Sequence, residues 1–184
     1  MIQLWYNSDE VNEFHPVVEQ SMNRALENCG YDSIAEVLHH PTIPNSTIIP
    51  DFAIRLKGSG RFVFVLEVKR TQRDVVSQRF QNQTRSYVTD FSPYWEPGFY
   101  KYFCLTNIER LIFFAERPGP ISTCILKDNP KEHAPFIAST KDATQSTVEF
   151  QSTLEEILGQ IFNRVTPEWE NNWEHIIDSF HQNF

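Results

Sequence analysis

The chain has 184 residues, of which 40% are hydrophobic and 22% charged, and a formal net charge of -8. Such a composition is ordinary for a globular protein with one sizeable core, so we expect a single domain over residues 1–184, with its core at about 13–127 and C-terminal helices at about 150–184. No apolar run approaches the ~18 residues that span a bilayer, and no basic leader precedes an apolar block, which argues against a membrane protein and a secreted one. The cysteines lack CxxC spacing, which argues against a disulfide framework and a zinc knuckle. We therefore expect a cytoplasmic location.

The first predicted helix begins near Ser8–Glu10 and ends at about Asn28. Pro16 suits its first turn, and Gly30 suits its end. The apolar residues of this segment recur with helical spacing and form one face: Val18, Met22, Ala25, Leu26 and Cys29. We therefore expect this face to pack on a core.

A strand hairpin follows the first helix. Residues 34–38 predict a short strand, and Thr47 to Leu56 predict a second one. Gly58-Ser59-Gly60 is typical of a tight turn, and Arg61 to Lys69 would form the antiparallel partner. Because the run from Phe62 is almost continuously apolar, we expect that last strand to be central in its sheet.

Three charged residues gather on this hairpin. Asp51 follows Pro50, and Glu67 and Lys69 lie two apart at the end of the apolar strand, so their side chains leave the same face. Two carboxylates and a lysine converging at a strand end can hold a divalent cation and an activated water, which is the chemistry of phosphodiester hydrolysis. The alternative is a surface salt bridge between Glu67 and Lys69 where the strand emerges.

A second helix is predicted from about Asp74 to Phe91. One face carries residues at helical spacing: Val76, Phe80, Gln83, Tyr87 and Phe91. Gln83 would then be a buried amide in an apolar and aromatic stripe, where an unpaired amide costs ~1–3 kcal/mol. Either it serves the neighbouring charged site or it bonds a nearby backbone group.

Three further strands are predicted at 101–106, 111–116 and 121–127, followed by a polar, irregular segment at 128–149. Ser152 and Glu155 are spaced as a capping box for a helix to about Val165, and Pro167 begins a last helix. The aromatic stripe of that last helix either packs on the sheet or forms a docking surface.

Basic residues are concentrated around the charged hairpin. The segment from Arg55 to Arg85 carries a net charge of +6, and the remainder carries -14. A basic face suits an approaching phosphate backbone, although a solvated helix face is the alternative. The candidate phosphate contacts are Arg70, Arg73, Arg79 and Arg85. The six histidines show no HxxxH spacing, which argues against a histidine-based metal site.

Pro50-Asp51, Glu67-x-Lys69 and the Gln83 to Tyr87 spacing resemble motifs of the PD-(D/E)XK nuclease superfamily. The Gln83–Tyr87 segment is similar to the QxxxY motif of its RecB-like branch and of type I restriction-enzyme nuclease domains. The strand, Thr-Asn turn and strand around residues 103–115 resemble the restriction-type domains. The resemblance covers roughly residues 13–116. It implies an α/β (α+β), restriction-endonuclease-like fold, a mixed central sheet of about five strands flanked by helices.

The resemblance also implies site roles. Asp51, Glu67 and the Val68 carbonyl would hold Mg²⁺ or Mn²⁺, and Lys69 would orient the water or stabilise negative charge, its role as base being open. Gln83 and Tyr87 would position these groups. The family carries an acidic residue on its first helix. Glu19 fits best because it lies on the core-facing stripe; Glu13 is the competing candidate.

The expected function is that of a Mg²⁺-dependent deoxyribonuclease in restriction, defence or DNA processing, with endonuclease favoured over exonuclease. DNA is the expected partner, and a motor or specificity subunit or domain is a further one. A homodimer would supply the two sites that double-strand cleavage needs. The alternatives are an inactive nucleic-acid-binding or assembly module with the same fold and a nuclease that acts on RNA.

Overall fold

A computed structural model describes residues 10–44, 46–116, 141–144 and 146–163. Within these residues, six strands form one sheet in the order of the sequence, and β3 and β4 are the only neighbouring pair that runs parallel. The predicted mixed sheet flanked by helices is confirmed, with six strands rather than about five. The strands are β1 (Ala35–His39), β2 (Phe52–Leu56), β3 (Phe62–Val68), β4 (Lys101–Thr106), β5 (Arg110–Glu116) and β6 (Lys141–Thr144).

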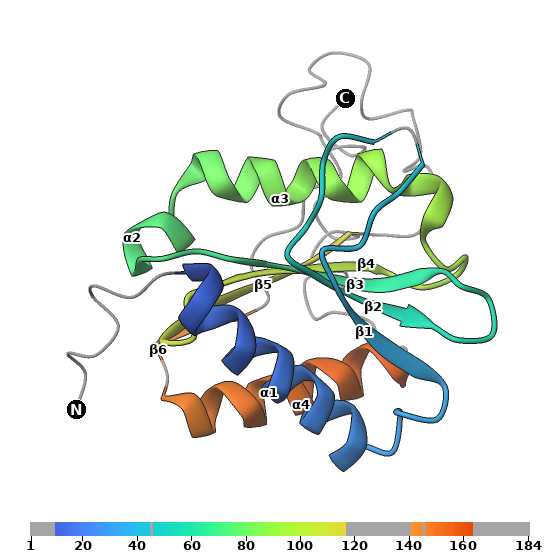
Figure 1. Ribbon diagram of the computed structural model, residues 1–184, viewed down its shortest axis with the longest axis horizontal. Helices are drawn as coiled ribbons and strands as arrows, with labels where there is room; N and C mark the ends of the chain where they lie inside the picture. The colour runs from blue at the N-terminus through green and yellow to red at the C-terminus, as the bar shows by residue number, and fades with distance from the viewer. Residues whose placement is uncertain (1–9, 45, 117–140, 145, 164–184) are drawn as a thin grey trace, which may run out of the picture.

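Helices cover both faces of this sheet (Figure 1). On one face lie α1 (His15–Asn28), preceded by a π-helical turn at Glu10–Phe14, and α4 (Thr147–Phe162). The crossover between the parallel strands carries the short α2 (Gln72–Val75), then α3 (Gln78–Asp90) and a 3₁₀ turn at Ser92–Tyr94. Since α3 lies over the opposite face, the fold has three layers.

Strand β3 is the centre of the sheet, as its apolar run predicts. All seven of its residues are buried, and it pairs with β2 on one side and β4 on the other. Phe64, Leu66 and Val68 contact the core under α1 and α4, whereas Val65 contacts the core under α3. Glu67 alternates with its neighbours and therefore leaves the sheet on the α3 face.

The expected strand from Thr47 is too long. Ladder pairing starts only at Phe52, opposite His39 of β1. Pro50 has no N–H for a ladder, and the Ser46 hydroxyl accepts a hydrogen bond from the Ile48 N–H at 3.1 Å, which makes a local turn. Asp51 therefore occupies a bend immediately before β2.

The single helix expected from Asp74 to Phe91 is two helices. Thr71 caps α2 by accepting from the Asp74 N–H, and the helix is interrupted after Val75. β-Branched residues restrict side-chain rotation in a helix, and two of them meet at this break. Val76, expected on the buried stripe, is 41% exposed.

The C-terminal part also differs from the expectation. Strand β6 lies in the segment read as irregular, while the strand expected at 121–127 and the helix expected from Pro167 lie outside the described residues. Helix α4 starts six residues earlier than expected. Its capping box consists of Ser146 and Glu149. Ser152 lies within the helix, and its hydroxyl donates a hydrogen bond to the Val148 carbonyl.

Ser146→Ala should lower the free energy of unfolding by about 1 kcal/mol, because the Glu149 N–H loses its acceptor. Ser152→Ala is the matched control. It should be neutral or slightly stabilising, because alanine has the higher helix propensity. Urea unfolding of both variants measures the difference, and equal effects would contradict the observed cap.

Among the described residues, no helix combines the length and apolar character needed to cross a membrane.

Candidate active site

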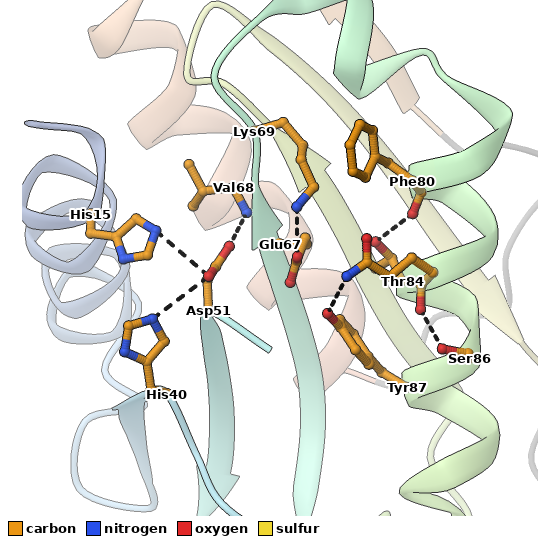
Figure 2. A network of polar contacts seen from close by, with 11 residues as sticks. His15, His40, Asp51, Glu67, Val68, Lys69, Phe80, Thr84, Ser86 and Tyr87 are labelled. Carbon is orange, nitrogen blue, oxygen red and sulfur yellow. Dashed lines mark hydrogen bonds and ion pairs between the residues drawn. The ribbon is translucent and has the colours of Figure 1, made fainter. Parts of the chain in front are cut away.

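The ends of β2 and β3 bring two carboxylates to one face of the sheet. Phe52 pairs with Leu66, and the next position of this antiparallel register puts Asp51 across from Glu67. Residues opposite each other in such a pair share a face. Asp51 Oδ2 accepts a hydrogen bond from the Val68 N–H at 2.7 Å, which holds this carboxylate against β3 (Figure 2).

Lys69 joins the same group. Its Nζ donates to Glu67 Oε1 at 2.7 Å, and the two residues are 8% and 4% exposed. The Lys69 backbone N–H donates to the Thr106 carbonyl at 2.8 Å, so the chain after β3 stays against β4. The pair is therefore buried and is not a surface salt bridge. Because desolvating two charges offsets their attraction, such a pair is a poor device for stability alone.

The surroundings of Glu67 favour its neutral form. Burial raises its pKa to about 7, the negative charge of Asp51 adds to this, and Lys69 opposes it. Within the described residues, Glu67 Oε2 is buried without a hydrogen-bond partner. A carboxylate in this position lacks sufficient positive charge and donors around it. Protonation of Glu67 or a cation shared with Asp51 would each satisfy this oxygen.

Helix α3 adds Tyr87 to the site. The Tyr87 hydroxyl interacts with the Glu67 carboxyl and lowers its pKa, but does not complete a hydrogen bond to Oε2. Gln83 Nε2 donates to the Tyr87 hydroxyl at 3.1 Å. Gln83 is exposed, contrary to the expected buried amide. The buried polar residue of this face is Thr84, whose hydroxyl donates to the Phe80 carbonyl at 3.0 Å.

Histidines line the other side of Asp51. The Nε2 atoms of His15 and His40 lie 3.6 and 3.7 Å from Asp51 Oδ1 (Figure 2). Sequence reasoning discounted both, because no HxxxH spacing is present. The available signal was the hairpin register, since a strand that ends at His39 opposite Phe52 ends beside Asp51. Burial lowers the pKa of His15, Asp51 opposes this shift, and the neighbouring His39, His40 and Lys69 add to it.

Glu19 does not occupy the expected place on the core-facing stripe. Its side chain is half-buried, and the α1 side chain that reaches Asp51 is His15. Glu19 lies one turn beyond His15, about 6 Å further along the helix axis. The buried face of α1 consists of His15, Val18, Ser21, Met22, Ala25 and Leu26.

Basic side chains surround the end of β3. Arg70 follows Lys69 directly, and Arg73 and Arg79 lie on α2 and α3; all three are exposed. The side chain of Arg85 lies outside the described residues. The exposed guanidinium groups are therefore available to a polyanion on the side of the sheet that α2 and α3 cover.

Comparison with known proteins gives two matches. The family model described as the BpuSI N-terminal domain matches residues 4–161. The structure is similar to that of the type IIG restriction endonuclease BpuSI, with 32% sequence identity and a TM-score of 0.61. That match covers 86% of this chain and 17% of the BpuSI chain, so this chain spans about a sixth of that enzyme. No curated protein matches the chain.

Proposed function

The chain belongs to the BpuSI N-terminal domain family of restriction-enzyme domains, and we propose that it is a divalent-metal-dependent nuclease that hydrolyses DNA phosphodiester bonds. The observation that carries this proposal is the Glu67 carboxyl. It is buried, it has a pKa of about 7, and its Oε2 has no hydrogen-bond partner among the described residues. Strongly perturbed carboxyls beside a lysine are typical of catalytic sites. We assign the site to the PD-(D/E)XK type.

The donor set fits a magnesium or manganese ion. Asp51 and Glu67 would hold it, together with the Val68 carbonyl. Mg²⁺ takes one or two carboxylates and keeps several waters, so few protein ligands suffice. When bound, the ion would supply charge neutralisation and a more acidic water.

The chain's own residues would do the remaining work. Lys69 donates to Glu67 and would orient the attacking water or stabilise negative charge on the phosphate. Tyr87 would hold the Glu67 carboxyl in place. Glu19 would contribute only through a second ion, because it lies a turn away from the histidine that contacts Asp51. The exposed arginines Arg70, Arg73 and Arg79 would position the strand, and we propose the same role for Arg85.

The DNA substrate and the wider assembly rest on the family. BpuSI is a type IIG restriction endonuclease, so a restriction or defence role is proposed here, with endonuclease action favoured. A motor or specificity domain would supply site recognition. Cutting both strands of a duplex would take either two copies of the site, as in a homodimer, or sequential nicking by one copy.

The test is cleavage of supercoiled plasmid, linear duplex, single-stranded DNA and RNA with Mg²⁺, Mn²⁺ or EDTA, alongside thermal unfolding with each ion. The proposal predicts cleavage of DNA that EDTA abolishes and a higher melting temperature with Mn²⁺. Cleavage of supercoiled plasmid would identify an endonuclease. If no substrate is cut and no ion changes the melting temperature, the domain is a binding module.

Tyr87→Phe should lower the cleavage rate by about 10-fold, as expected for groups that orient a ligand. Since Tyr87 lowers the Glu67 pKa, its loss should also move the acidic limb of the pH–rate profile to higher pH. Gln83→Ala should have the smaller effect, because Gln83 is exposed and acts through Tyr87. Cleavage rates of both variants measured from pH 5.5 to 8.5 test this prediction. An acidic limb at the same pH in Tyr87→Phe as in the unaltered protein would contradict it.

A further inference from the structure

We propose that His15, His39 and His40 form a second metal site, distinct from the carboxylate site, that takes a borderline transition-metal ion such as Zn²⁺. One ring nitrogen from each histidine lies within 4.8 Å of the others. His15 is distant in sequence from the adjacent pair His39 and His40, and the fold joins the start of α1 to the end of β1. This site does not depend on the nuclease assignment.

The histidines are held in place by packing. His15 is 2% exposed, and its Nδ1 lies 3.0 Å from His39 Nε2. The His39 ring stacks on Phe52, with centroids 4.7 Å apart and an interplanar angle of 11°. His40 is more exposed, with its backbone at a positive φ of 46°. Two rings are therefore fixed, and the third is free to adjust.

His15 carries an unsatisfied nitrogen. Within the part of the chain that the structure describes, its Nε2 is buried and has no hydrogen-bond partner. Asp51 Oδ1, at 3.6 Å, is too distant for a hydrogen bond. An unpaired buried nitrogen costs free energy, and a metal ion would relieve that cost.

The ligand type selects the ion. Imidazole nitrogens suit Zn²⁺, Co²⁺, Ni²⁺ and Cu²⁺, whereas Mg²⁺ prefers carboxylate and water oxygens. Zn–N bonds of about 2.0–2.1 Å place tetrahedral ligand nitrogens about 3.3 Å apart. The observed separations, within 4.8 Å, need only side-chain rotation, which exposed His40 allows. A water would take the fourth position.

The competing interpretation is a metal-free histidine cluster that forms ion pairs with Asp51. Titration of the whole chain with Zn²⁺ by calorimetry, and with Co²⁺ by visible absorption, separates the two. We expect one high-affinity ion per chain, because imidazole ligands bind Zn²⁺ more selectively than the carboxylate site does. His39→Gln and His40→Gln alter exposed side chains and should each weaken binding by at least about 10-fold, the loss that even outer-sphere partners of a metal cause.

Two matched variants locate the ion. His133→Gln removes a histidine from outside the described residues, and Glu67→Gln removes the key carboxylate of the nuclease site; neither should change Zn²⁺ affinity. Full affinity in both His39→Gln and His40→Gln, or loss in Glu67→Gln or His133→Gln, would overturn the proposal. Cleavage is scored separately, so a failed nuclease assignment would leave this result intact.

Discussion

Glu67→Gln should lower the rate of Mg²⁺-dependent DNA cleavage by at least about 100-fold. The amide keeps the shape of the side chain but removes the negative charge that binds the ion. The Lys69 ammonium also loses its anionic partner at 2.7 Å. Removing a single electrostatic contact to a reacting group commonly costs 10²–10³-fold, and loss of an ion affects several such contacts together.

A matched control is Glu27→Gln, because Glu27 is an exposed glutamate on α1 and the chemical change is the same. Its rate should equal that of the unaltered protein. Asp51→Asn should resemble Glu67→Gln, since both carboxylates would hold one ion. Single-turnover cleavage at saturating Mg²⁺ measures the effect. Rates within 3-fold of the unaltered protein for both site variants would remove the assigned site.

The sequence predicts the carboxylate half of this site because that half depends on local rules. Alternation along β3 puts Glu67 and Lys69 on one face whatever the rest of the fold does. The continuous apolar run makes β3 central, and the turn at Gly58–Gly60 fixes β2 as its antiparallel partner. Those three features suffice to bring Asp51 across from Glu67.

The histidine half depends on packing between distant segments. His15 lies beside Asp51 because the first turn of α1 packs next to the start of β2. The hydrophobic periodicity within α1 does not reveal that placement. The same limit explains the error at Glu19. Periodicity defines a stripe about 100° wide, and the sheet decides which residues at its margin are buried.

Helix α3 shows the same limit on a smaller scale. Residues three or four apart lie on the same face of a helix. Gln83 and Thr84 are therefore equally compatible with a buried stripe that contains Phe80 and Tyr87. The structure buries Thr84 and exposes Gln83. The cap of α4 is ambiguous in the same way, because Ser146 and Ser152 are each followed by a glutamate three residues later.

Glu67→Gln should also change the pH dependence of stability in the metal-free protein. The folded-state pKa of Glu67 is raised from 4.5 to about 7, so the folded protein binds more protons than the unfolded chain between these values. Stability of the unaltered protein therefore falls as pH rises from about 4.5 to about 7, on the order of 3 kcal/mol from this group. Glutamine does not titrate, so the Glu67→Gln variant should not lose this stability as the pH rises.

Urea unfolding at pH 5 and pH 8, in EDTA, tests this comparison. The lowered His15 pKa has the opposite sign, adding stability as pH rises through 6.5, but Glu67 is not among its causes, so it cancels between the two proteins. The variant should gain stability relative to the unaltered protein at pH 8. Adding Mn²⁺ at pH 8 should stabilise the unaltered protein more than the variant, because only the former keeps both carboxylates. A stability difference that is the same at both pH values would show that Glu67 titrates normally and has no need of a cation.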